Sequence, residues 1–247
     1  NTDTPATRHA ADRAVSSWNI DGEPRLLGRL ENFTYEAGSY GRERIIRVTE
    51  PSHRTIAEIE AELDWLRFIS EQGISVAGPL PSENGNLVET FDAEDGPYLV
   101  SVFTKAPGRP MRFSLDWNPE FHRNLGELIG RMHAATMIYR PSEGIQQRGS
   151  WLEEMRYIGQ FIPKHEALAR REFDEVMEWA SSLETGPDTF GLVHTDLNYS
   201  NFFVGEASSI TAFDFDDCHY NWFAYDLAVT LFYALLSFDL PSMDAAQ

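Results

Sequence analysis

The spacing of apolar residues changes once along this chain, near a segment rich in proline and glycine at 107–110. Before this segment, short apolar runs bounded by turn residues predict strands within 25–49 and 85–103. After it, apolar residues recur mainly at helical spacing. This order predicts an α+β fold in two lobes. We expect an antiparallel β lobe over 1–103 and a mostly helical lobe over 104–247, with a small-molecule site between them.

One helix interrupts the predicted strands of the first lobe. The segment 52–73 carries an apolar stripe at spacings of three and four residues, and Ser52 or Thr55 can cap its start. Gly73 is expected to end the helix because glycine readily adopts the left-handed conformation found at helix ends. The stripe consists of Ile56, Ile59, Leu63 and Leu66.

Other local signals complete the first lobe. Residues 8–18 are expected to form a short helix. The sequence "GSYG" at 38–41 predicts a hairpin turn, and the Asn-Gly and Asp-Gly pairs at 84–85 and 95–96 predict two further turns.

The chain is strongly acidic, with a formal net charge of −19 and only two lysines, Lys105 and Lys164. This charge argues against nucleic acid or an anionic membrane as the main partner. It leaves two explanations open: general solubility, or an acidic cleft that attracts cationic substrates.

The location of the protein is predicted from what the sequence lacks. The single cysteine, Cys218, excludes an intrachain disulfide and is expected to be a small buried apolar group. The sequence has no signal-peptide pattern and no apolar run long enough to span a membrane. We therefore expect a cytoplasmic location.

Two acidic residues and an amide fall at a chemically suggestive spacing. Asp196 precedes Asn201 by five residues, and Asp214 follows thirteen residues later, between runs that resemble strands. A short loop and a hairpin would bring the three side chains together. Amide and carboxylate oxygens suit Mg²⁺, and a second carboxylate can accept a proton from an attacking hydroxyl. Phosphoryl transfer requires this combination.

The same residues carry a family resemblance. "HTDLNYSN" at 194–201 resembles the kinase catalytic loop H-x-D-x-x-x-x-N, and "FDFDD" at 213–217 resembles the D-F-G segment. No arginine follows the histidine, and no lysine stands two residues after the aspartate. These features, with "YDLA" at 225–228, resemble the aminoglycoside phosphotransferase and choline kinase family. The resemblance runs from about residue 25 to the end and implies a protein-kinase-like fold.

The resemblance implies roles for the residues of these motifs. Asp196 would be the catalytic base or would orient the acceptor hydroxyl. Asn201 and Asp214 would bind Mg²⁺. His194 would pack beneath the loop, and Asp226 would brace it.

Asp216 departs from the pattern because it stands where kinases usually have glycine. Two interpretations stay open: Asp216 contacts the metal, or it is solvated. Asp217 is expected to be a local cap or loop residue.

A second departure lies in the first lobe, which contains no lysine. At the position where kinases place a lysine that grips the ATP phosphates, this sequence has Arg47. Arginine can also hold phosphate oxygens, through its forked donor geometry. We expect Glu62 to pair with Arg47, and Glu60 and Asp64 to be solvated.

The segment 103–108 resembles the kinase hinge. Phe103 would lie at the back of the adenine pocket, while the Thr104 carbonyl and the Ala106 amide would meet the adenine edge. The loop over the phosphates would lie within 28–35, where Gly28 is the single glycine. The first lobe would thus bind ATP.

The function implied is transfer of the ATP γ-phosphate to a hydroxyl of a small molecule, with ATP and Mg²⁺ as cofactors. An amino alcohol, an aminoglycoside or a homoserine-like acceptor fits, and helices within 111–124 and 151–183 would hold it. The second segment carries many acidic and aromatic residues. Two explanations stay open: a pocket for a cationic acceptor, or ordinary helix packing with solvated acids. Related proteins usually carry more helices that help form the acceptor site, so two explanations stay open: the helical lobe is incomplete at its C-terminus, or this segment is shorter than usual. A Ser/Thr protein kinase of the same branch and a regulatory pseudokinase remain alternatives.

Overall fold

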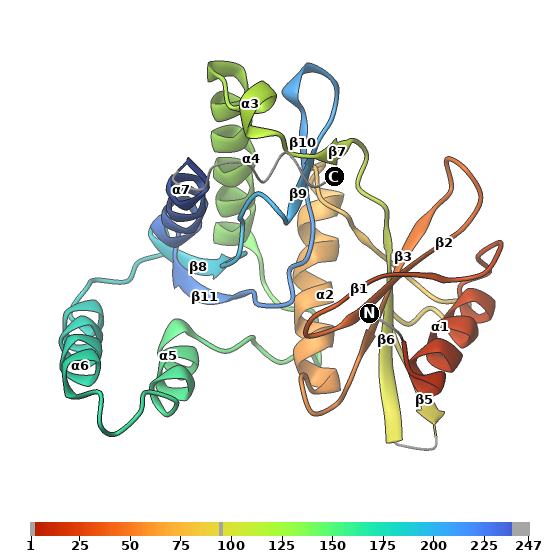
Figure 1. Cartoon of the computed structure of the whole chain (residues 1–247), viewed down its shortest axis with the longest axis horizontal. Coiled ribbons are helices and arrows are strands. Elements are labelled where there is room, and N and C mark those ends of the chain that lie inside the picture. Colours follow the sequence, from red (N-terminus) through yellow and green to blue (C-terminus); the bar gives the residue numbers. More distant parts are fainter. Residues whose placement is uncertain (1–2, 94–95, 239–247) are drawn as a thin grey trace.

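The computed structural model of the chain describes residues 3–93 and 96–238. The turn expected at 95–96 therefore lies partly outside the described residues. The segment from 239 onward lies entirely outside them. The larger sheet is antiparallel, as predicted, and β6 is its centre because it pairs with three other strands (Figure 1). Its strands are β1 (Arg25–Arg29), β2 (Phe33–Ala37), β3 (Arg44–Thr49), β4 (Pro79–Leu80), β5 (Val88–Ala93) and β6 (Gly96–Thr104).

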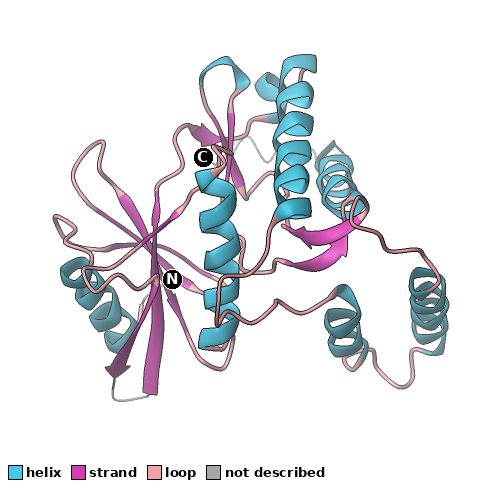
Figure 2. Cartoon of the chain, turned by 180° about the vertical axis from the view of Figure 1, so that it is seen from behind, coloured by secondary structure: helices cyan, strands magenta, loops and turns pink. Residues whose placement is uncertain are grey.

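Two helices cover opposite faces of this sheet (Figures 1 and 2). Helix α1 (Pro5–Ser17) buries small residues and Trp18 against Tyr35 and Ile46. Helix α2 (Ile56–Glu71) packs on the other face, next to Phe103. The sheet therefore contributes to two hydrophobic cores, one on each side.

The start and end signals of α2 are confirmed, and Ile59, Leu63 and Leu66 of the predicted stripe are buried, but Ile56 in the first turn is exposed. Thr55, and not Ser52, is the N-cap: its hydroxyl accepts from the Glu58 amide, and the Glu58 carboxylate accepts from the Thr55 amide. The helix ends before Gly73, whose φ of +71° is the left-handed conformation that glycine adopts most readily.

The rest of the chain is mainly helical, with short strands that carry the motifs. The helices are α3 (Phe113–Asp116), α4 (Pro119–Ile138), α5 (Trp151–Gly159), α6 (Ala167–Ser181), α7 (Ala224–Phe238) and the 3₁₀ turn η1 (Glu206–Ser208). Strands β7 (Arg109–Pro110), β9 (Phe202–Val204) and β10 (Ile210–Ala212) form one small sheet, and β8 (Phe190–Val193) pairs with β11 (His219–Trp222). The α+β class is confirmed, while the boundary at 103/104 stays a prediction.

One hydrophobic core joins α2 to the motif-bearing segments. It runs from α2 and Phe103 through α4 to Leu197, Phe215 and Cys218. The Phe215 ring meets Trp65 of α2 edge to face at 5.6 Å, and Cys218 is fully buried, as predicted. This shared core fixes α2 against the segment that carries the second motif.

The backbone just after β6 also passes very close to the backbone at the end of β9. Gly108 has a φ of +102°, and a Cβ at this position would lie 2.6 Å from the Val204 carbonyl oxygen. Only glycine fits here, so the expected hinge passes directly beside β9. No described helix is both long and apolar enough to cross a membrane.

Asp64 corrects one expectation, because it is buried and not solvated. Its carboxylate accepts hydrogen bonds from the Tyr139 hydroxyl, from the Ser142 amide and hydroxyl, and from Arg67. Burial opposes ionisation, but the hydrogen bonds from Ser142 and Tyr139 outweigh it and lower the pKa of Asp64. These bonds tie α2 to the segment after α4.

Replacing Asp64 with alanine should lower the free energy of unfolding by about 2–3 kcal/mol, because donors to a buried charge lose their acceptor. The lowered pKa means that the contribution of Asp64 is present above its ordinary pKa and is lost as the pH falls through the folded-state value. Urea denaturation of both proteins from neutral to acidic pH should show the difference shrinking in acid. Glu60→Ala, one turn earlier, is the matched control; an equal effect there would contradict the assignment.

Candidate active site

The loop 194–201 between β8 and β9 is held in place by one buried carboxylate. Asp226, at the start of α7, accepts from the Thr195 amide at 2.8 Å and from the His194 amide at 3.3 Å. His133 Nε2 of α4 lies 3.0 Å from the same carboxylate. Thr195 has a φ of +70°, which a β-branched residue adopts only at a cost. The predicted bracing contact of Asp226 is confirmed, and it stabilises this turn.

His194 lies beneath the loop, as predicted. Its Nδ1 is 3.4 Å from the Asp196 amide, and its Nε2 is 3.0 Å from the Phe213 carbonyl oxygen. Its ring packs on Phe215 at 4.3 Å. The histidine therefore links the two motifs and is fully buried.

Asp196 is oriented by two amides. Asn198 Nδ2 donates to Asp196 Oδ1 at 2.8 Å, and Asn201 Nδ2 donates to Asp196 Oδ2 at 2.7 Å. Asn201 also donates to the Asp196 backbone carbonyl. Because the NH₂ group of Asn201 is committed to Asp196, its oxygen faces other partners, of which only the Ser200 hydroxyl at 3.4 Å lies among the described residues.

The hairpin of β9 and β10 returns the chain to this loop. The strands pair antiparallel, and the Phe213 amide donates to the Asn201 carbonyl oxygen at 2.9 Å. Asp214 follows directly, so the hairpin places it beside Asn201. The predicted hairpin return is therefore confirmed. The φ of Asp214 is +64°, a conformation that strains most residues and is tolerated better by aspartate.

The carboxylate of Asp214 makes no hydrogen bond or ion pair with another described residue. The residue is exposed by surface area, but protein atoms crowd its carboxyl group. This loss of hydration raises the pKa of Asp214 to about 6, against the charge of Arg47. The Asp214 carboxyl group and the Asn201 amide oxygen, whose one described partner is the Ser200 hydroxyl at 3.4 Å, fit a divalent cation because both are hard oxygen ligands.

Arg47 and Glu62 form a buried ion pair between β3 and α2. Two parallel hydrogen bonds of 2.8 and 2.6 Å join the guanidinium to the carboxylate, and the residues are 5% and 0% exposed. Burial opposes the charge, but Glu62 and Asp216 outweigh it and raise the pKa of Arg47. The predicted pairing is confirmed. Arg47 lies 5.0 Å above the Phe103 ring, and its Nε is buried without a hydrogen-bond partner among the described residues.

Asp216 is buried, 4% exposed, so the solvated interpretation is wrong. Its carboxylate is 2.6 Å from His53 Nε2 and lies near Asn32, Arg47 and Arg54. Burial opposes ionisation, but the His53 hydrogen bond and the two arginine charges lower the pKa of Asp216. Asp217 lies in the loop, as expected, and its carboxylate pairs with Arg54 at 2.6 Å.

The expected hinge lies at the end of β6. The Thr104 amide donates to the Gly78 carbonyl, so only its own carbonyl side is available to a ligand at this residue. Ala106 is buried, and its amide has no partner among the described residues. Between them, Lys105 turns away and pairs with Glu36. The assignment of the Thr104 carbonyl and the Ala106 amide to the adenine edge stays a prediction.

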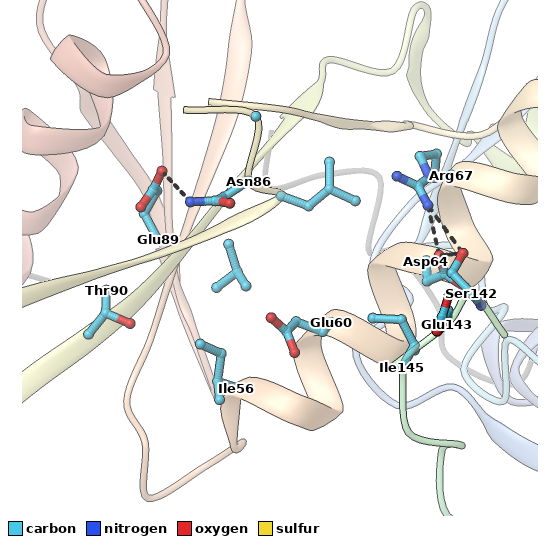
Figure 3. Close-up of a pocket in the computed structure, with 13 residues that line it drawn as sticks. Ile56, Glu60, Asp64, Arg67, Asn86, Glu89, Thr90, Ser142, Glu143 and Ile145 are labelled. Atoms are coloured by element: carbon cyan, nitrogen blue, oxygen red, sulfur yellow. Dashed lines mark hydrogen bonds and ion pairs between the residues drawn. The ribbon is translucent and has the colours of Figure 1, made fainter. Parts of the chain in front are cut away.

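A cavity of about 560 Å³ lies elsewhere, along α2 (Figure 3). It is lined by residues of α2, by the segment 85–90 and by residues after α4. The α2 residues are Ile56, Glu60, Asp64 and Arg67, and those after α4 are Ser142, Glu143 and Ile145. None of its lining residues belongs to either motif. Asp64 is two residues from Glu62 and therefore faces a different side of the helix. This cavity is separate from the site built around Asp196.

Several polar residues of the site were not predicted from the sequence. They are Asn32, His53, Arg54, Arg148 and Asn198. The Arg148 guanidinium donates to the carbonyls of Glu58, Asp216 and Cys218 and so joins α2 to the second motif. Asn198 had a visible signal, since it stands two residues after Asp196. The others lie far from the motifs in sequence, and no local pattern marks them.

Sequence comparison identifies related proteins. The profile described as "Phosphotransferase enzyme family" matches residues 24–246. The amicoumacin kinase of Bacillus subtilis (strain 168) is 36% identical over 224 residues, which cover 90% of this chain and 66% of that protein. The chain spans smaller shares, 60% and 52%, of two further curated relatives.

Comparison with solved structures also finds kinases. A structure titled as an amicoumacin kinase in complex with AMP-PNP, Ca²⁺ and Ami aligns with a TM-score of 0.87 at 33% identity, covering 96% of this chain and 71% of that one. A microcompartment-associated aminopropanol kinase aligns with a TM-score of 0.66 at 24% identity, covering 90% and 73%. The predicted two-lobed, protein-kinase-like fold is confirmed.

Replacing Asp226 with asparagine should destabilise the protein by about 2–4 kcal/mol, because an amide NH₂ would then face buried N–H donors. The Thr195 turn should loosen first. Thermal unfolding and amide exchange at Thr195 measure the two effects. Asp174→Asn, on the exposed surface of α6, is the matched control and should leave both unchanged. An Asp226→Asn protein with unaltered melting temperature and exchange would contradict the bracing role.

Proposed function

Because the chain belongs to the phosphotransferase enzyme family, we propose that it transfers the γ-phosphate of ATP to a hydroxyl group of a small molecule, with Mg²⁺ as the metal. The observation that carries this proposal is the grouping of Asp196, Asn201 and Asp214. Two amide donors orient the Asp196 carboxylate, and the nearby oxygens of Asn201 and Asp214, which would be the metal ligands, lack strong partners within the described structure.

Asp196 would act on the acceptor hydroxyl. Its two oxygens are each fixed by one amide donor, and each retains a lone pair for a substrate proton. When the acceptor oxygen bonds to the γ-phosphorus, the bond from that phosphorus to the bridging oxygen of ADP breaks. The hydroxyl proton passes to Asp196, and ADP leaves. The hydrogen bonds from Asn198 and Asn201 keep the carboxylate in one orientation for this step.

Asn201 and Asp214 would hold the metal. A bound Mg²⁺ would neutralise negative charge on the phosphates during transfer. The amide oxygen of Asn201 and the carboxylate of Asp214 are hard oxygen ligands, which Mg²⁺ prefers. The carboxylate of Asp214 has no hydrogen bond or ion pair with another described residue, so its oxygens are available to a cation, which supports the assignment.

The nucleotide would bind between Phe103, the hinge and Arg47. The Thr104 carbonyl and Ala106 amide would meet the adenine edge. Two donors of Arg47 are used by Glu62, and its Nε has no partner, so the guanidinium can still donate to a phosphate oxygen. Glu62 would hold the arginine in the orientation needed. This division of donors lets an arginine replace the lysine that kinases use.

The acceptor would be a small molecule with a hydroxyl group. The amicoumacin kinase and aminopropanol kinase named above support this class, because both are named for small acceptors. Strand β11 begins at His219, directly after the second motif. This leaves no long segment there to bind a protein substrate, which favours a small molecule. The negative charge of the chain would suit a cationic acceptor.

Asp196→Asn tests the proposal. ADP release from Mg·ATP would be measured with a panel of acceptors: aminoglycosides, choline, ethanolamine, homoserine, a basic protein and none. The wild type should respond to a small alcohol. The variant should keep its ATP affinity and lose turnover by roughly 10²–10⁴-fold, because the proton acceptor is gone. Asp188→Asn, in the exposed segment before β8, is the control. Full turnover in Asp196→Asn would refute the assigned base, and a response to the protein alone would refute the acceptor class.

Asp214→Ala tests the metal site separately. In the wild type, nucleotide affinity should rise with Mg²⁺, because metal and phosphates bind together. In the variant this dependence should disappear, since a ligand is missing and the remaining Asn201 is neutral. Titration calorimetry with AMP-PNP at several Mg²⁺ concentrations measures it, with Asp174→Ala as the control. If the affinity of the variant still rose with Mg²⁺, another residue would be the ligand.

A further inference from the structure

Asp216 gathers side chains from three segments of the first lobe onto one carboxylate. His53 Nε2 lies 2.6 Å from its Oδ2, and Asn32 Nδ2 donates to the same oxygen at 3.3 Å. Arg54 Nε lies 3.6 Å from Oδ2, and the Arg47 guanidinium lies 3.8 Å from Oδ1. These four partners come from the loop 30–32 between β1 and β2, from β3, and from the loop between β3 and α2.

The contact has two consequences for the first lobe. Asn32 is itself fixed, because its Oδ1 accepts from the Thr49 hydroxyl at 2.6 Å. The loop that would cover the nucleotide phosphates is therefore tied to the segment that carries Asp214. The neighbouring Leu30 is 97% exposed, so apolar packing does not hold this loop in place.

The backbone of Asp216 is held separately, by the side chain of Arg148. Arg148 donates to the carbonyl oxygens of Asp216 and Cys218, and also to Glu58 of α2. The main chain of Asp216 is therefore fixed independently of its side chain. Replacing the carboxylate should leave the backbone in position and release only the first-lobe partners.

We propose that Asp216 is a positioning residue that, through His53 and Asn32, holds the loop 30–32 over the nucleotide phosphates. This inference rests on the proposed function, since it assumes that nucleotide binds beneath that loop. Its effect would appear in nucleotide affinity and not in the metal requirement, because the side-chain hydrogen bonds of Asp216 among the described residues go to His53 and Asn32 of the first lobe and none goes to Asn201 or Asp214.

The geometry favours this role over metal binding by Asp216. Glu31, His53 and Asp216 each offer an atom within 4.8 Å of the others, which is close enough for a shared cation. However, the 2.6 Å contact between His53 and Asp216 is a hydrogen bond, and two guanidinium groups already lie within 3.8 Å of the carboxylate. Their positive charge opposes a further cation at this place.

The test uses a double-mutant cycle on the full chain. Asp216→Asn, His53→Gln and the double variant would be compared with the wild type for AMP-PNP affinity by calorimetry, at saturating Mg²⁺ and across a Mg²⁺ series. Each single variant should bind nucleotide about tenfold more weakly, and the double variant no more weakly than either. The Mg²⁺ midpoint should stay unchanged. Hydrogen exchange in the loop 30–32 should speed up in all three variants. His165→Gln and Asp188→Asn, both exposed, are the controls.

Each other outcome overturns the inference in a distinct way. Additive losses would show that Asp216 and His53 act independently. A higher Mg²⁺ midpoint in Asp216→Asn but not in His53→Gln would make Asp216 a metal ligand. Normal nucleotide affinity in the variants would refute the positioning role and leave the proposed function intact. A wild type that binds no AMP-PNP would refute the proposed function and this inference with it.

Discussion

The buried ion pair of Arg47 and Glu62 is the interaction on which the rest of the structure depends. Both residues are almost fully excluded from solvent, and an unpaired charge at either position would be strongly destabilising. The pair therefore requires β3 and α2 to stay in register with each other. Asp216, from the helical lobe, lies 3.8 Å from the Arg47 guanidinium. The positive charge of Arg47 is therefore close to one acid from each lobe. The position of α2 thus also fixes the segment that carries Asp214.

The catalytic loop depends on a comparable arrangement. A strained turn at Thr195 is held by a buried carboxylate on α7, and the hairpin of β9 and β10 brings Asp214 back to Asn201. The side chains proposed for proton transfer and for metal binding thus come from one short stretch of chain. The nucleotide side is built differently, because Arg47, Glu62 and the hinge come from separate elements that only the shared core brings together.

The corrected expectations for two aspartates have a common cause. The sequence predicts a solvated Asp64, and for Asp216 either solvation or metal contact, because an isolated aspartate is usually exposed. Each can be buried because hydrogen-bond partners from distant parts of the sequence surround its carboxylate. These partners are Tyr139 and Ser142 for Asp64, and His53 and Asn32 for Asp216. Burial of a charge needs such partners, and spacing along the chain does not reveal them.

The sequence by itself determined the fold class, helix α2, most strands of the larger sheet and the residues of the two motifs. Local signals suffice for these: the capping box at Thr55, the alternating strands, and the fixed spacing of Asp196, Asn201 and Asp214. The pairing of Arg47 with Glu62 could also be predicted, because the family resemblance implies an acid on this helix and helical spacing places Glu62 at the edge of the buried stripe. Only the tertiary structure decided which polar residues converge on Asp64, Asp216 and Asp226. Those contacts join segments far apart in the chain, and they exist because packing of the shared core brings those segments within hydrogen-bond distance.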